Sequence, residues 1–331
     1  SRNVGLDLSR VALRGYGVAT GSEAVISAGG TLTLNLASIA IAPSGSATGT
    51  ATRLDPSFFS EGGFSSYALI ADQVAFADGM TLAPTPQTLV ADSSLYTHPS
   101  AAGLAQVASL RTFAAEQRPG TALTFKAAGD IVLPAGTILA PGIGGRVSLT
   151  GDNVTVRGVI DAPAGAIAVA GSNVTVESTA RMLARGATRI ITDFRGERGG
   201  TVHDGGSVNL DALDEIAIQR GALIDVSGTS GVIDVVEGGN VRDGSHPLTL
   251  ASNGGSINIS AVGGMIEGTL IGNPGGPGAS GGGLGITLAA SGASALDQLK
   301  DVLLVLQPGC YGYGNGNCDG VSWQDSVGFD F

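Results

Sequence analysis

Residues 145–163 read Gly-Arg-Val-Ser-Leu-Thr-Gly-Asp-Asn-Val-Thr-Val-Arg-Gly-Val-Ile-Asp-Ala-Pro. Three short runs in this stretch, 146–149, 153–156 and 159–161, alternate apolar and small polar side chains, which is the period-two pattern of β-strands. Glycine, aspartate and asparagine separate the runs, and these residues are typical of tight turns. The stretch therefore predicts three short strands joined by turns, which is the content of one coil of a β-solenoid.

The same pattern recurs about twenty residues later in the chain. From Val147 to Ile167 is 20 residues (167 − 147), and Val154 and Val174 have the same separation. Matching runs begin at Gly145, Gly206 and Gly255, at Asp152 and Ser172, and at Gly79, Gly136, Gly158 and Gly221. Stacked coils share backbone hydrogen bonds and bury their inward apolar side chains against one another. Residues 1–290 are therefore predicted to form an all-β fold, a β-solenoid.

The spacing between matching strands is not uniform. From Ile167 to Val208 is 41 residues (208 − 167), and from Val208 to Ile257 is 49 (257 − 208). The excess falls in stretches rich in glycine and charge, which indicates loops thrown out at coil corners, where insertions are tolerated. We place these insertions at about residues 44–63, 85–120, 188–206, 228–245 and 272–283. The third and fourth of them are the predicted binding loops.

Two segments have a helical pattern. Residues 101–117 place four apolar side chains at spacings of three, namely Leu104, Val107, Leu110 and Phe113. Residues 294–306 are similarly apolar and end before Pro308. We expect short helices that flank the β-helix or cover its open end, where unpaired strand edges would be exposed. The predicted β-helix is thus followed by a helical cap over 291–308 and a Gly/Asn-rich tail over 309–331.

The composition limits the core and the partners. The chain has 331 residues with 54 glycines but only 5% aromatic residues, so the core is expected to consist of Val, Ile, Leu and Ala. Lys+Arg is 17 and Asp+Glu is 28, a net charge of -11, which disfavours a nucleic-acid partner. No run of 18 apolar residues occurs, so no membrane-spanning helix is expected. We expect a piece of a longer exported protein whose export signal lies upstream.

Two strings resemble the filamentous haemagglutinin family of large exoproteins. They are residues 145–163, and Ser60-Glu-Gly-Gly-Phe-Ser-Ser-Tyr67 followed by Asp78-Gly-Met-Thr-Leu-Ala-Pro84. The resemblance is one of repeat style, is shared with other β-helices, and covers about residues 1–290. It implies a right-handed parallel β-helix that is secreted across a Gram-negative envelope through an outer-membrane partner. It also implies a non-enzymatic role outside the cell or at its surface, with no catalytic residue and no cofactor carried over.

The function predicted from these features is that of a structural or adhesive segment. It would act as an extended scaffold that displays loops for surface or cell–cell attachment, with a surface glycan or a protein receptor as partner. A second hypothesis is a subunit of a multi-chain extracellular assembly, which would expose strand edges matched to a partner chain at either end.

A third hypothesis is a polysaccharide-active β-helix enzyme, either a lyase or a glycoside hydrolase. Such chemistry needs carboxylates clustered on one sheet, as an acid/base pair or as calcium ligands. The densest acidic set is Asp211, Asp214, Glu215 and Asp225. A catalytic cleft would also use Asp204, with Arg220 or Arg242 nearby. The alternative, which the strand pattern favours, is that these acids form turns.

Two places could hold a metal ion. His203-Asp204 and the pair Asp243 and His246 lie in predicted insertions and could meet on one face, although solvated loop residues are the simpler interpretation. The tail partly resembles an EF-hand-type calcium loop, with oxygen ligands at Asn315, Asn317, Asp319 and Asp325. Its first ligand is Asn rather than Asp, and its last acid comes one place early. The alternative is a turn closed by a disulfide between Cys310 and Cys318, which an oxidising compartment would permit.

Overall fold

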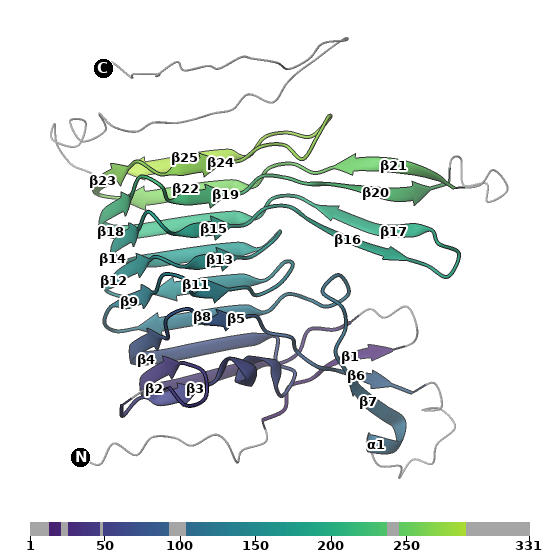
Figure 1. Cartoon of the computed structure of the whole chain (residues 1–331), viewed down its shortest axis with the longest axis horizontal. Coiled ribbons are helices and arrows are strands. Elements are labelled where there is room, and N and C mark those ends of the chain that lie inside the picture. Colours follow the sequence, from purple (N-terminus) through teal and green to yellow (C-terminus); the bar gives the residue numbers. More distant parts are fainter. Residues whose placement is uncertain (1–12, 21–25, 47–48, 93–103, 237–244, 289–331) are drawn as a thin grey trace.

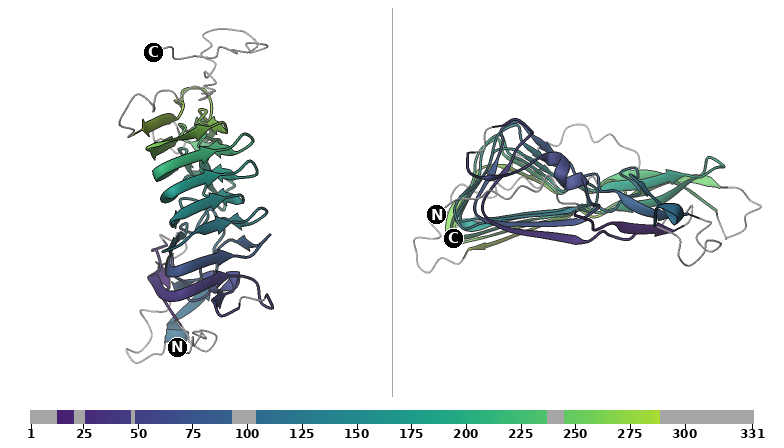
Figure 2. Two further views of the ribbon diagram at one scale, coloured as in Figure 1. Left: turned by 90° about the vertical axis from the view of Figure 1, so that its left-hand side faces the viewer. Right: turned by 90° about the horizontal axis from the view of Figure 1, so that it is seen from below.

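The computed structural model of the chain describes residues 13–20, 26–46, 49–92, 104–236 and 245–288. Over these ranges the chain is almost entirely β-structure, and most strands belong to two parallel sheets (Figure 1). Seen from below, successive coils of the chain overlie one another as a triangle, and the remaining strands project from one corner of it (Figure 2). The prediction of an all-β, largely parallel architecture is confirmed for the described residues.

Two parallel sheets form the stack. The larger has twelve strands: β2 (Thr31–Ile41), β3 (Thr52–Leu54), β4 (Ser66–Phe76), β8 (Ala122–Ala127), β9 (Ile131–Leu133), β11 (Arg146–Thr150), β12 (Asn153–Val156), β14 (Ala166–Val176), β18 (Ser207–Ile218), β22 (Ser256–Ala261), β23 (Gly263–Ile266) and β25 (Gly283–Leu288). The smaller has six: β5 (Thr81–Leu82), β10 (Ile138–Leu139), β13 (Val159–Asp161), β15 (Arg181–Leu183), β19 (Leu223–Asp225) and β24 (Thr269–Ile271). The long strands β4, β14 and β18 each pair with two shorter strands, so the larger sheet covers two sides of the coil.

The repeat spacing predicts the strand register correctly. Val147 pairs with Ile167, and Val154 pairs with Val174, each one coil of 20 residues apart. The two longer intervals also hold, because Ile167 pairs with Val208 and Val208 with Ile257. Each insertion therefore leaves the stack and returns to it without shifting the register of the next coil.

The smaller sheet shows one difference from the sequence match. Aligning the runs at Gly136 and Gly158 would place Leu139 beside Asp161, whereas Leu139 pairs with Ile160 in the structure. The predicted register is therefore wrong by one residue at this pair of strands. Side chains alternate between the two faces of a strand, and Leu139 and Ile160 are both fully buried. Stacking of inward side chains, rather than alignment of the turn glycines, sets the register.

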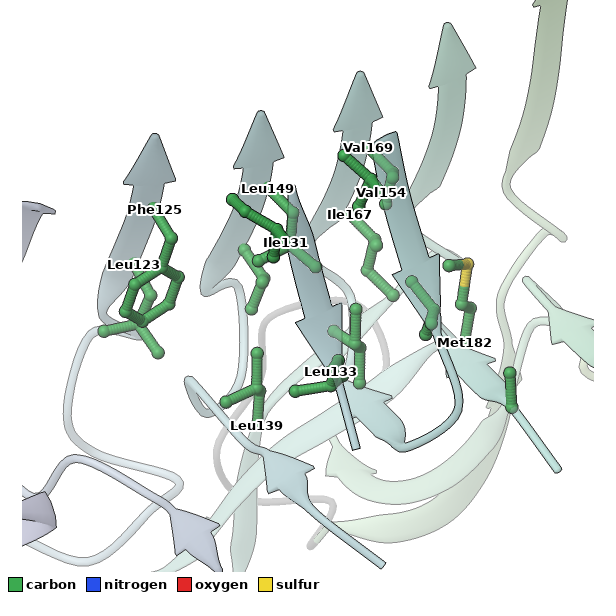
Figure 3. Close-up of a cluster of buried hydrophobic side chains, with 14 of the residues drawn as sticks. Leu123, Phe125, Ile131, Leu133, Leu139, Leu149, Val154, Ile167, Val169 and Met182 are labelled. Atoms are coloured by element: carbon green, nitrogen blue, oxygen red, sulfur yellow. The ribbon is translucent and has the colours of Figure 1, made fainter. Parts of the chain in front are cut away.

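Aliphatic side chains in vertical columns make up most of the core. Leu123, Val147, Ile167 and Val208 lie in register on four successive strands and are fully buried. Side chains from the other strands of each coil point into the same interior and form one hydrophobic cluster with these columns (Figure 3). Burial of each such side chain contributes about 1.5–3 kcal/mol, so the stack is stabilised along its whole length.

The end of the stack nearest the N-terminus is filled by aromatic rings, which the expectation of a purely aliphatic core did not include. Phe59 and Tyr67 are fully buried with ring centroids 4.9 Å apart, and Phe76 and Phe125 have the same separation. The Tyr67 hydroxyl donates a hydrogen bond to the Phe59 carbonyl at 2.9 Å. Burial raises the pKa of Tyr67 well above its usual range, and the charge of Glu61 adds to the effect.

Outward asparagines form ladders between coils. Asn153 Nδ2 donates to Asp130 Oδ1 at 2.8 Å, and Asn173 Nδ2 donates to Asn153 Oδ1 at 2.9 Å. Asn258 Nδ2 donates in the same way to Asn209 Oδ1 at 2.9 Å. The Asn-x-Thr triplets at Asn153 and Asn173 and the Asn-x-Ser triplet at Asn258, which match the glycosylation pattern, are therefore explained by strand alternation and stacking.

The helix predicted for residues 101–117 is largely wrong. Helix α1 covers only Leu104–Val107, and the next four residues form strand β7 (Ala108–Arg111). This strand is antiparallel to β6 (Thr88–Ala91), whose other edge pairs in parallel with β1 (Gly17–Thr20). Pairing with an exposed edge of β6 satisfies the backbone of this segment and overrides its weak helical spacing.

Two further predictions concern other segments. The segment predicted as an insertion at 44–63 contains strand β3 and a short 3-10 helix, η1 (Pro56–Ser60), which Asp55 caps by accepting a hydrogen bond from the Ser57 backbone. The predicted cap at 291–308 and the tail at 309–331 lie outside the described residues.

Candidate functional surface

The insertions predicted as binding loops are β-hairpins. Strands β16 (Ala187–Thr192) and β17 (Arg198–His203) form one antiparallel pair, and β20 (Ser230–Val235) and β21 (His246–Ala251) form another. Both leave the stack on the side that also carries β1, β6 and β7 (Figures 1 and 2). We refer to the two hairpins together as the lateral blade. The two insertions leave the stack where they were predicted, but as β-hairpins rather than loops, because they pair their backbone groups within themselves.

The turn of the first hairpin is fixed by one carboxylate. Asp193 Oδ1 accepts hydrogen bonds from the backbone N–H groups of Arg195 at 2.8 Å and Glu197 at 3.0 Å. Gly196 adopts φ of 84°, a left-handed conformation that favours glycine. The sequence Asp-Phe-Arg-Gly-Glu over 193–197 therefore encodes a defined turn rather than a loose loop.

The two hairpins pack directly against each other. A side chain at Gly231 would place its Cβ 2.8 Å from Ile190 Cδ1 and 2.9 Å from Thr188 Cγ2. Glycine at this position therefore lets strand β20 lie close on the first hairpin. The contact between the hairpins is too tight to admit even a methyl group without a shift.

An ion pair joins the same two hairpins near their outer part. Arg198 Nη2 lies 2.8 Å from Asp234 Oδ1, while Arg198 Nε and its backbone N donate to Asp234 Oδ2 at 3.1 Å and 2.7 Å. Hydrogen bonds from the Arg198 side chain, and then from its backbone, lower the pKa of Asp234 to about 2. This bidentate geometry brings specificity as well as attraction, so the hairpins are held as one unit.

The root of the blade is anchored to the stack. Arg189 Nη2 donates to the carbonyl of Ile143 at 2.7 Å, across 46 residues of sequence. The Gly186 backbone N also donates to the Ser227 carbonyl at 2.7 Å, which joins the roots of the two hairpins. The blade is therefore a supported extension of the coils.

An aromatic side chain stands at the tip of the first hairpin. Phe194 is 92% exposed, and the Arg195 guanidinium carbon lies 5.2 Å from the centre of its ring. Ile191 and Leu248 are also exposed on the blade. Phe194 was not among the residues predicted from the sequence. An aromatic residue in a turn of a chain with few aromatic residues could have indicated a binding position. Aromatic and arginine side chains are the types most often responsible for affinity in protein interfaces.

The structure does not bring the two histidine sites together. His203 pairs with Ala187 at the root of the first hairpin, while His246 pairs with Val235 toward the outer end of the second. His203 Nε2 is 2.9 Å from the hydroxyl of Thr201. Within the described ranges no three His, Cys, Asp or Glu side chains are placed to hold a metal ion. Asp243 lies outside those ranges.

The acidic residues considered for catalysis fall in two separate groups. Asp211, Asp214 and Glu215 are exposed on β18, where its pairing changes from β22 to β23. Asp204 and Asp225 lie near the roots of the hairpins. Each has a structural partner there, because Asp204 Oδ1 accepts from the Asn253 backbone at 2.8 Å and Asp225 Oδ1 from the Ser227 backbone at 2.9 Å.

Of the remaining predicted positions, one lies in the described ranges and the others lie outside them. Arg220 is paired with Glu267 at 3.7 Å. Arg242 lies outside the described residues, as do the predicted calcium ligands Asn315, Asn317, Asp319 and Asp325 and the cysteines Cys310 and Cys318.

Comparison of the chain with protein-family models, with curated proteins and with solved structures gives no match. Over the residues that the structure describes, no helix has both the length and the apolar character needed to cross a bilayer.

Proposed function

We propose that the stack is a right-handed parallel β-helix of the filamentous haemagglutinin type. Parallel strands in one sheet are joined by right-handed connections in almost all known proteins, which favours this hand. The 20-residue coils in direct register support the β-helix, because they match one turn of such a solenoid. Each coil adds about 4.8 Å of length, so a longer chain of this kind would reach far from the surface that carries it.

The function that the geometry supports best is that of an extracellular or cell-surface scaffold that presents the lateral blade for attachment. The single observation that carries this proposal is Phe194, which is 92% exposed on a turn held by Asp193. A ring in that position contributes almost nothing to the core. Aromatic and arginine side chains are enriched among the residues that dominate the affinity of protein interfaces.

Rigidity of the blade strengthens the argument. The Arg198–Asp234 pair and the close packing at Gly231 fix the two hairpins relative to each other. A pre-organised contact surface loses less conformational entropy when it binds than a flexible loop does. Secretion through an outer-membrane partner, and a glycan or protein receptor as the target, are parts of the same proposal.

The proposal can be tested by adhesion of beads that carry the purified chain. Beads are allowed to settle on polystyrene, collagen, fibronectin and a cell monolayer, and retention under flow is counted. The double variant Phe194→Ser, Arg195→Ser should lose about tenfold or more of the attachment that the unaltered chain shows. Leu213→Ser is the matched control, because Leu213 is 75% exposed on β18, a strand of the stack that is not part of the blade.

Two results would count against the proposal. One is equal retention of the double variant and the unaltered chain on every surface that the chain binds. The other is failure of the unaltered chain to attach to any of the four surfaces.

A further inference from the structure

A polar depression lies at the end of the stack nearest the N-terminus, apart from the lateral blade. Its walls come from the segment before β1, from the 3-10 helix η1 and the turn after it, and from the ends of β6 and β7. Its volume is about 480 Å³, which falls within the 300–1,000 Å³ usual for sites that bind small molecules. Arg14, Tyr16, Glu61, Gln87 and Thr112 are among its lining residues.

The walls of the depression are held by backbone geometry. Gly62 and Gly63 have φ of 69° and 70°, and the Gly15 backbone N donates to the Gly62 carbonyl at 2.7 Å. A side chain at Gly63 would collide with the ring of Tyr16. Consecutive left-handed residues favour glycine strongly, so this turn is shaped to leave room for the tyrosine.

The floor beside η1 is also fixed. The Thr85 backbone N donates to Ser60 Oγ at 2.9 Å, which ties η1 to the segment that leads into β6. Asp55 caps η1 and accepts from the Ser44 backbone N at 2.7 Å. Hydrogen bonds from the Ser57 backbone, and then from Ser44, lower the pKa of Asp55 to about 2. Hydrogen bonds therefore fix the backbone around the depression.

Its polar side chains have free hydrogen-bonding capacity. Among the described residues, the side chains of Arg14, Glu61, Gln87 and Thr112 have no hydrogen-bond or ion-pair partner. Together they offer both donors and acceptors, since arginine only donates, carboxylate only accepts, and amide and hydroxyl groups do both. One cation and one anion leave the lining with no formal excess of charge.

We propose that this depression binds a neutral, hydroxyl-rich ligand, namely one or two residues of an uncharged saccharide. Sugar hydroxyls donate and accept at once, which suits the mixed set of Arg14, Glu61, Gln87 and Thr112. The Tyr16 ring would supply an apolar surface for the C–H face of the sugar. A phosphate would require a net positive charge in the lining, whereas here the charge of Glu61 cancels that of Arg14. A lipid would require an apolar lining.

Saturation-transfer difference NMR on the full chain tests the proposal. The neutral probes are the methyl glycosides of four sugars: glucose, galactose, mannose and N-acetylglucosamine. Glucose 6-phosphate is the charged comparison. We expect transfer to at least one neutral probe, and a loss of about tenfold in affinity for Gln87→Ala and Tyr16→Ala. Phe194→Ser, at the tip of the blade, should leave this binding unchanged and so separates this site from the proposed attachment surface.

Circular dichroism melting of each variant shows whether it is folded, and Gln87→Ala serves where Tyr16→Ala fails to fold. Transfer to no neutral probe would overturn the proposal. So would transfer of equal strength in the unaltered chain and Gln87→Ala, or binding of glucose 6-phosphate alone.

Discussion

Replacement of Leu149 by alanine tests the stacked core at its centre. Leu149 is fully buried on β11, between Phe125 of the coil before it and Val169 of the coil after it. Strands above and below are held at the fixed spacing of a parallel sheet, so the neighbours cannot close the space that the substitution leaves. Ser148→Ala, at the adjacent outward position between Thr124 and Ala168, is the matched control.

The expected magnitude follows from that rigidity. Leu→Ala substitutions in cores cost about 2.7–5 kcal/mol and cost most where the site cannot collapse, so we expect about 3 kcal/mol or more for Leu149→Ala. With an unfolding entropy of about 2.1 cal/mol/K per residue, each kcal/mol lowers the melting temperature of a chain of 331 residues by about 1.4 °C, which gives a shift of about 4 °C or more. Ser148→Ala should change stability by less than about 0.5 kcal/mol.

Thermal and urea unfolding, followed by far-ultraviolet circular dichroism, measure both variants. Equal stability of Leu149→Ala and Ser148→Ala would contradict the stacked core, because it would mean that the two positions do not differ in burial. A larger loss for Ser148→Ala would place the inward and outward faces of β11 the wrong way round.

Three other predictions follow from the blade and the aromatic end. Gly231→Val should separate the two hairpins, since its Cβ would lie 2.8 Å from Ile190 Cδ1, and hydrogen exchange should rise in β16 and β17 but not in β11. Because the folded-state pKa of Asp234 is about 2 and its unfolded value is about 3.9, its pairing contributes above about pH 4 and is lost as the pH falls toward 2. The protection of the hairpins against hydrogen exchange should fall as the pairing is lost. The Asp234→Asn variant should show this lower protection already at neutral pH. Tyr67→Phe removes the hydrogen bond to the Phe59 carbonyl and should cost about 1 kcal/mol in urea unfolding, and no change would exclude that bond as a stabilising contact.

The parts of the fold that repeat could be predicted from the sequence. Val147 and Ile167, or Ile167 and Val208, carry matching patterns because stacked coils present equivalent inward positions to each other. Glycines were a poorer guide, as the one-residue difference between the runs at Gly136 and Gly158 shows. A turn can gain or lose a residue, whereas a strand that slips by one residue exposes its whole apolar side.

The parts that do not repeat could not be predicted in the same way. Spacings of three in residues 104–113 fit a helical turn, but the partner strand β6, which decides the outcome for Ala108–Arg111, is visible only in three dimensions. The hairpins of the blade contain glycine and arginine in their strands, which masks their alternation. The depression beside Tyr16 is lined by residues from four segments that lie apart in the sequence, and no local pattern predicts that they come together.

Spin labels placed at Ala168 and Asn209 would test whether the coils that contain β14 and β18 stack on each other. These outward positions pair in parallel on β14 and β18, although 41 residues (209 − 168) that include the first hairpin separate them in sequence. Stacked coils predict a backbone separation of about 4.8 Å and therefore strong dipolar broadening in the spectrum. A spectrum that equals the sum of the two single-label spectra would contradict the stack.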